Sequence, residues 1–178
     1  MITAATALAV AVLSGGATVY STRSTQRLQR EFRASEAKSA VQAQRTAALA
    51  EYGAAAAAFI AACSELAGEL APSNRDPAHC IAKHDVYLAR WARLQEARLP
   101  AKTHAAADGA LASQVNLVDV AAVSLDGVTE AWFQEVKRYD WQIDKRSPDS
   151  LLKARQACQQ ALAEFEDAVV ARTSAAAL

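Results

Sequence analysis

The chain has 178 residues, and its 19 basic and 19 acidic side chains give a formal net charge of zero, so no general attraction to nucleic acid is expected. Six glycines and four prolines, in a chain rich in alanine, favour helix nearly everywhere and disfavour a sheet. Without a short N-terminal segment, the chain is still long enough to form one domain with a hydrophobic core.

The first twenty residues, MITAATALAVAVLSGGATVY, contain no charged side chain. A helix over Ile2–Tyr20 would be about 28 Å long, close to the ~30 Å hydrocarbon core of a bilayer. We therefore predict a transmembrane anchor at residues 1–20. A cleaved signal peptide is an alternative, because small residues at 15–17 suit cleavage, although no basic residue precedes the apolar run. A buried helix of a soluble protein is a third, which the lack of a polar face disfavours.

Small residues recur at every fourth position of this segment, which would let a second helix approach closely. They are Thr3, Ala7, Ala11 and Gly15. Self-association through the first helix is therefore one predicted partner interaction.

Basic side chains follow the apolar segment directly, at Arg23, Arg27, Arg30 and Arg33. Lys and Arg concentrate on the cytoplasmic side of a span, so we predict a single-pass protein of the cell membrane with its body in the cytoplasm. The same arginines would lie among anionic headgroups, which makes the lipid bilayer a predicted partner. An extracytoplasmic body, anchored or secreted, is the alternative. Residues 21–40 are polar nearly all round and predict a solvated helical stalk next to the membrane.

A seven-residue repeat begins at residue 41 and predicts a helix packed in a bundle or coiled coil. One row is Val41, Ala48, Ala55 and Ala62; the other is Arg45, Tyr52, Phe59 and Leu66. The anchor and stalk would continue into this helix. We predict an antiparallel helical bundle over residues 41–174.

Three further helices complete the predicted bundle. Asp76-Pro77 starts the second, and Leu99-Pro100 is expected to end it, because the residue before proline disfavours helix. The third should run from there through Asp126-Gly127 to about Tyr139, and Ser147-Pro148 starts the fourth. Short connections predict up-down-up-down topology.

These boundaries make the third helix about 60 Å long and the second about 33 Å, so the end of the third should project beyond the bundle. Aromatic and basic side chains there predict a surface for an unidentified protein partner. It comprises Trp132, Phe133, Arg138 and Trp141. In the alternative interpretation, the seven-residue spacing turns Trp132 and Tyr139 inward.

Cys63, Cys80 and Cys158 are odd in number and widely spaced, which indicates reduced thiols and agrees with a cytoplasmic body. Cys80 and His84 lie one turn apart, so a metal-binding sensor or enzyme that uses them, with Cys63 or Cys158, is an alternative. The sequence lacks a phosphate-binding glycine loop, a Gly-x-Ser-x-Gly elbow and a His-Glu-x-x-His motif. We therefore predict no enzymatic activity, no cofactor and no metal.

The polar stretch STRSTQRLQREFRASEAKSAVQAQR and the alanine-rich helix AALAEYGAAAAAFIAA, after a short small-residue span, carry a resemblance. Over residues 1–65 the layout resembles a diffuse group of uncharacterised actinobacterial single-span membrane proteins with an Ala-rich helical domain. The resemblance implies membrane anchorage and a helical fold. The leading prediction is a membrane-anchored helical scaffold or adaptor that binds a protein partner through its bundle.

Overall fold

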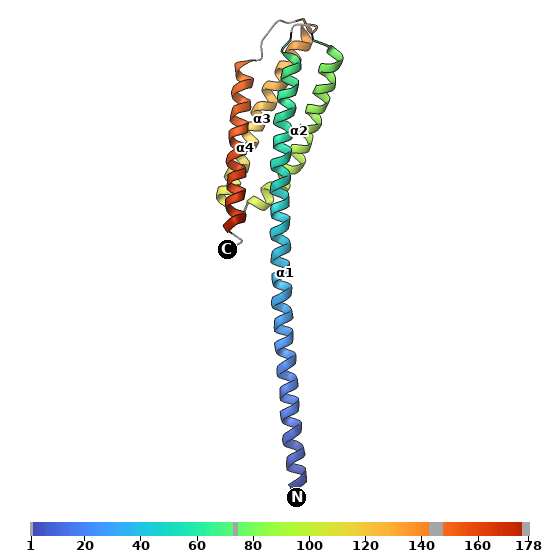
Figure 1. Cartoon of the computed structure of the whole chain (residues 1–178), viewed down its shortest axis with the longest axis vertical. Coiled ribbons are helices and arrows are strands. Elements are labelled where there is room, and N and C mark those ends of the chain that lie inside the picture. The colour runs from blue at the N-terminus through green and yellow to red at the C-terminus, as the bar shows by residue number, and fades with distance from the viewer. Residues whose placement is uncertain (1, 73–74, 143–147, 176–178) are drawn as a thin grey trace. The chain divides into compact units, whose positions relative to one another are not determined.

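The computed structural model describes residues 2–72, 75–142 and 148–175, and side chains within that part from residue 29 to residue 174. The described residues form four helices and no strand (Figure 1). They are α1 (Ile2–Leu70), α2 (Pro77–Ala105), α3 (Gly109–Arg138) and α4 (Asp149–Ala175). The all-α prediction is confirmed. The first helix continues from the N-terminal segment into the bundle, as predicted, and is long and apolar enough to span a membrane.

The chain divides into two compact units, Met1–Gln44 and Arg45–Leu178. The first consists of the N-terminal part of α1. Its described side chains, at residues 29–44, are all exposed, in keeping with a polar stalk. The side chains of the predicted anchor, residues 1–20, lie outside the described part, so the anchor is a prediction from sequence.

Two segments with described side chains, Gln29–Leu70 and Gly109–Arg138, contain an 18-residue stretch apolar enough to cross a membrane. Of these stretches, 50% and 33% respectively are buried within the protein. Both segments supply the bundle core, and core helices of soluble proteins share this length and apolarity. Because parts of both stretches are buried, their apolar side chains are explained by packing in the bundle, whether or not residues 1–20 cross a bilayer.

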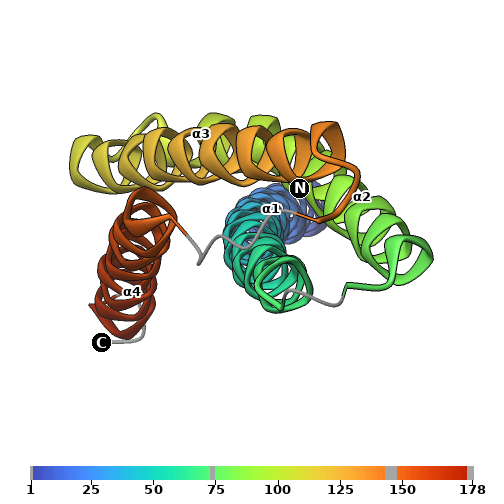
Figure 2. The same cartoon turned by 90° about the horizontal axis from the view of Figure 1, so that it is seen from above.

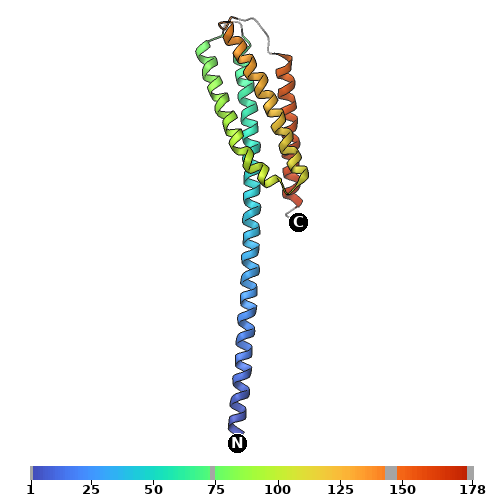
Figure 3. The ribbon, with the colours of Figure 1, turned by 180° about the vertical axis from the view of Figure 1, so that it is seen from behind.

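The unit Arg45–Leu178 is an antiparallel bundle in which successive helices alternate in direction (Figures 1 and 3). Viewed along the bundle, α1 lies between α2 and α4 and against one face of α3 (Figure 2). The up-down-up-down topology is therefore confirmed.

The seven-residue repeat of α1 supplies much of the core. Tyr52, Phe59 and Leu66 are fully buried, whereas Val41 is 61% exposed, so packing starts later than the repeat. Across the bundle, the ring of Phe59 lies 5.0 Å from that of Trp91 on α2. The rings of Tyr52 and Phe165, the latter on α4, are perpendicular, with their centres 5.5 Å apart. Aromatic side chains of α1 thus contact both neighbouring helices.

The predicted boundary between the second and third helices is wrong, because Pro100 lies inside α2. A proline there removes one backbone hydrogen bond and crowds the preceding turn. Ala97, Ala101 and Ala105 are nevertheless buried at four-residue spacing, so the apolar face continues past it. The real break comes where the side chain of Asp108 accepts a hydrogen bond from Leu111 N at 3.2 Å and caps α3. As predicted, α3 then runs through Asp126-Gly127 without interruption.

A buried carboxylate joins three helices. Asp119 on α3 is 7% exposed, and its Oδ1 accepts a hydrogen bond from the Tyr52 hydroxyl of α1 at 2.7 Å. Its Oδ2 lies 2.7 Å from Arg98 Nε and 2.5 Å from Lys102 Nζ, both on α2. Burial, followed by the hydrogen bond to Asp119, raises the pKa of Tyr52, so the phenol stays protonated. A buried charge needs such partners, and this one fixes the register of α1 and α2 on α3.

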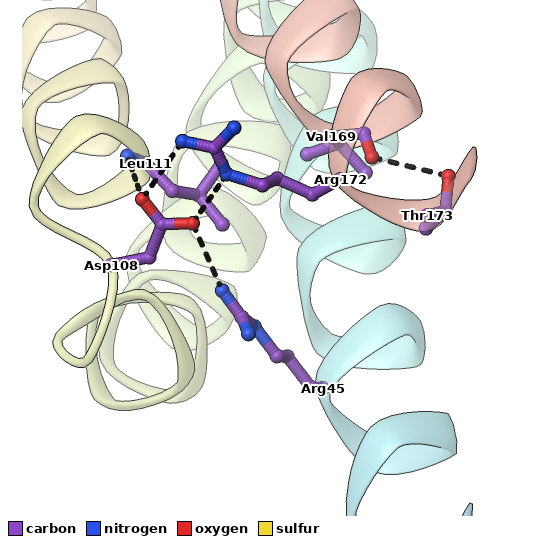
Figure 4. Close-up of polar contacts among 6 residues, drawn as sticks. All are labelled: Arg45, Asp108, Leu111, Val169, Arg172 and Thr173. Carbon is purple, nitrogen blue, oxygen red and sulfur yellow. Dashed lines mark hydrogen bonds and ion pairs between the residues drawn. The ribbon is translucent and has the colours of Figure 1, made fainter. Parts of the chain in front are cut away.

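A second carboxylate joins three helices at the end of the bundle where α3 begins (Figure 4). Besides capping α3, Asp108 accepts hydrogen bonds from Arg172 of α4, with Nε to Oδ2 at 2.6 Å. Arg45 Nη2 of α1 lies 3.6 Å from the same Oδ2. The hydrogen bond from Arg172, and then that from Leu111 N, lowers the pKa of Asp108 to about 2.

We predict that Tyr52→Phe lowers the free energy of unfolding by about 1–2 kcal/mol, because Asp119 loses a hydrogen bond to a buried charge. Urea denaturation followed by tryptophan fluorescence measures the change, since Trp91, Trp132 and Trp141 all lie in the bundle unit. Tyr139→Phe makes the same change on a side chain that is 55% exposed and should alter stability by less than about 0.5 kcal/mol. Equal effects of the two substitutions would contradict the role of Asp119.

The pH dependence of stability should reveal the Asp108 cluster. Its pKa falls from the usual 3.8 to about 2 on folding, so the ionised carboxylate stabilises the fold above pH 4 and this contribution disappears as pH falls toward 2. Asp108→Asn keeps a capping side chain but removes the charge. We expect it to be less stable than the native chain at pH 6 and equally stable near pH 2. Arg172→Gln should behave alike; a stability difference that does not change with pH would refute the assignment.

Candidate functional site

The predicted aromatic partner surface is divided between core and surface. Trp132 and Phe133 are each 2% exposed, and the ring of Phe133 stacks on His84 at 3.7 Å. The prediction that the third helix projects beyond the bundle is wrong. Pro100 belongs to α2, so α2 and α3 have 29 and 30 residues and are nearly equal in length. Trp132 faces inward, as the alternative interpretation held, whereas Tyr139 is 55% exposed and does not.

The other two residues of that surface lie near the C-terminal end of α3. Arg138 is exposed, and Trp141 is half-buried with its ring 5.8 Å from Phe133. The helix ends in a turn with positive φ at Asp140 (51°) and Trp141 (63°), closed by a hydrogen bond from Trp141 N to Val136 O at 3.1 Å. The four side chains therefore do not form one exposed patch.

Of the four predicted membrane-proximal arginines, Arg30 and Arg33 are exposed. The side chains of Arg23 and Arg27 lie outside the described part of the chain. All four lie on α1 in the unit Met1–Gln44.

The residues that the alternative prediction of a metal site would use make other contacts. His84 Nε2 lies 2.7 Å from Glu130 Oε2, and the Cys80 thiol donates to Glu69 O at 3.6 Å. Burial raises the pKa of Cys63 to about 12 and that of Cys158 to about 11, so both keep their protons at neutral pH. Among the described residues, no group of three or more His, Cys, Asp or Glu side chains is arranged to hold a metal ion.

The sequence interpretation missed a groove between α1 and α4. A Cβ atom placed on Gly53 of α1 would lie 3.4 Å from Phe165 Cε1 of α4, so the helices nearly touch there. A Cβ placed on Gly68, four turns further along α1, would meet nothing within 4 Å. We call the space that widens from Gly53 to Gly68 the α1–α4 groove.

Two adjoining cavities that share Ser64 make up the groove. The narrow end encloses about 290 Å³ and is lined by Ala57, Ile60, Ala61, Ser64, Gln159, Leu162, Ala163 and Glu166. The wide end encloses about 350 Å³ and is lined by Cys63, Ser64, Ala67, Gly68, Ala71, Leu125, Asp149, Leu151, Leu152 and Arg155. On the α1 side, the groove is lined mostly by small side chains, and on the α4 side mostly by larger ones.

One charged group stands out at each end of the groove. Glu166, at the narrow end, forms no ion pair in the part of the chain that the structure describes. Arg155, at the wide end, has a buried Nε atom without a hydrogen-bond partner among those residues. The Ser64 hydroxyl already donates to Ile60 O at 2.9 Å. Apolar walls with few polar groups suit binding, and the described residues of the lining include no histidine that could serve as a general base.

Sequence patterns gave little signal for this site. The small residues of α1 that line it all fall outside the two seven-residue rows, where a solvent-facing position is the default expectation. Arg155 belongs to no motif and lies among ordinary polar residues of α4. Only the separation of the two helices brings these residues together.

Comparison with protein-family models, with curated proteins and with solved structures finds no match. The resemblance to actinobacterial membrane proteins therefore stays a prediction. The function of the chain has to be argued from the groove itself, since a helical bundle serves many functions.

Proposed function

We propose that the chain is a membrane-tethered adaptor without enzymatic activity, whose bundle holds a helix of a partner protein in the α1–α4 groove. The observation that supports this most is the groove itself, which runs along one side of the bundle and is lined largely by apolar side chains. Leu152, at its wide end, is 47% exposed, so the groove presents apolar surface to solvent. Exposed apolar surface of this kind is typical of interaction sites.

The dimensions and chemistry of the groove favour a helix as the occupant. From Ala57 to Ala71, α1 spans about 21 Å, which matches about four turns of a docked helix. Small side chains along this face let a partner backbone approach, while Ile60 and Leu162 offer apolar contacts. Glu166 at the narrow end would attract a basic side chain of the partner.

The location is part of the proposal. We place the protein in the cell membrane through a single span at residues 1–20, with the bundle in the cytoplasm. The apolar segment followed by Arg23, Arg27, Arg30 and Arg33 supports this orientation. The three free, buried thiols agree with a reducing compartment.

Photo-crosslinking in cells tests the groove. We expect a photoreactive residue at Gln159, in the lining of the narrow end, to give a discrete adduct with one partner. The same residue at Val86, 45% exposed on α2, should not give that adduct. Ala61→Glu, which places a charge in the groove at an exposed helix position, should abolish it while the purified protein keeps its helical circular dichroism.

Three results would contradict a heterologous helix in the groove. One is an adduct that survives Ala61→Glu, and another is the same adduct from Val86. An adduct of twice the mass of the chain would instead identify a second copy as the occupant.

Thiol labelling of intact cells tests the orientation. The native thiols are at most 1% exposed, so they contribute little background. We expect an impermeant maleimide to spare Thr25→Cys in intact cells and to label it after lysis. A cysteine added before Met1 should react in intact cells and serves as the control. Labelling of Thr25→Cys in intact cells would reverse the proposed orientation.

A further inference from the structure

The wide end of the α1–α4 groove contains a polar group that the rest of the fold does not explain. Arg155 projects from α4 into this cavity, and its Nε atom is buried without a hydrogen-bond partner in the described residues. Elsewhere in the bundle, Arg98 and Arg172 each pair with a carboxylate at 2.6–2.7 Å. A guanidinium that is partly withdrawn from water and has no anion is costly, so Arg155 indicates a missing partner.

We propose that this cavity binds a small molecule composed of one carboxylate and a short apolar chain, with the carboxylate on Arg155. The planar guanidinium presents donors that match the two oxygens of a carboxylate. A partner helix that reached Ala71 would cover the same cavity, so the ligand and the partner helix compete for the wide end of the groove. The cavity volume of about 350 Å³ is within the range of small-molecule sites.

The lining of the cavity selects an apolar body for the ligand. The side chains of Cys63, Leu125 and Leu151 are at most 4% exposed and form its inner wall. The Cys63 thiol keeps its proton and so adds no charge. An aliphatic chain of several carbons that covers this wall removes apolar surface from water, which is the main source of affinity in such a pocket.

The remaining polar groups argue for a monoanion. Ser64 already donates its proton to Ile60 O, so Arg155 is the principal side-chain donor lining the cavity. Asp149, exposed at the edge of the cavity, repels a second negative charge. A phosphate dianion needs more donors than the described residues of this lining supply, whereas one carboxylate matches the one guanidinium among them.

Titration of the full chain in lipid nanodiscs with hexanoate tests the proposal. Thermal unfolding is followed by tryptophan fluorescence, which reports on the bundle alone because all three tryptophans lie there. We expect hexanoate to raise the unfolding midpoint in a saturable manner, because a ligand of the folded state stabilises it. Neither 1-hexanol, which lacks the charge, nor inorganic phosphate, which lacks the chain, should do so.

Matched variants separate the site from effects of the lipid. Arg155→Gln should weaken hexanoate binding by at least about tenfold, whereas Lys153→Gln, an equal loss of charge at an exposed position outside the cavity lining, should leave it unchanged. Gly68→Leu places a side chain in open space and should abolish binding with Arg155 intact. This variant keeps the test valid if Arg155→Gln does not fold.

Four results would overturn the proposal: no saturable shift in the native chain, equal binding by Arg155→Gln, binding that survives Gly68→Leu, or an equal shift with 1-hexanol or phosphate. Because hexanoate binding and the Gln159 adduct are measured separately, each proposal can fail alone.

Discussion

The buried contact between Tyr52 and Asp119 sets the geometry on which the rest of the bundle depends. A carboxylate that is withdrawn from water must keep its partners, so the Tyr52 hydroxyl fixes one level of α1 against α3. At the same level, the Tyr52 ring packs perpendicular to that of Phe165 and fixes α4. Beyond this level α1 and α4 are free to separate, because the α1 side chains that face α4 are too small to fill the space between them. The groove thus begins where the contacts of Tyr52 end and the small side chains of α1 face α4.

The arginines of the bundle differ in whether a carboxylate accompanies them. Arg98 is paired with Asp119, and Arg172 is paired with Asp108, and each pair joins helices that are distant in the sequence. Arg155 also lies on a helix face, but it lines a cavity, and its Nε atom has no hydrogen-bond partner among the described residues. The ion pairs of Arg98 and Arg172 hold the helices of the bundle together. The guanidinium of Arg155, with an unsatisfied donor, lowers the stability of the bundle while the cavity is empty and favours an anionic ligand there.

Much of the fold follows from local patterns. The seven-residue repeats predicted the helices and placed Tyr52, Phe59 and Leu66 in the core, and continuity through Asp126-Gly127 was also predicted. The one wrong boundary had large consequences. Ending the second helix at Pro100 made the third helix too long and moved Trp132 and Phe133 out of the core. A rule about the residue before proline could not include the packing of Ala101 and Ala105, which depends on the other helices.

The sequence alone determined the all-helical fold, the order and direction of the helices, and the Asp76 cap, whose carboxylate accepts from Ala78 N at 3.0 Å. These depend on neighbours in the chain and on the spacing of apolar residues. Only the tertiary structure decided where a site could form. Gly53 and Gly68 both lie inside α1, yet one abuts Phe165 and the other borders open space. That difference depends on which side chains face each other across two helices about 100 residues apart in the sequence, and no local pattern records it.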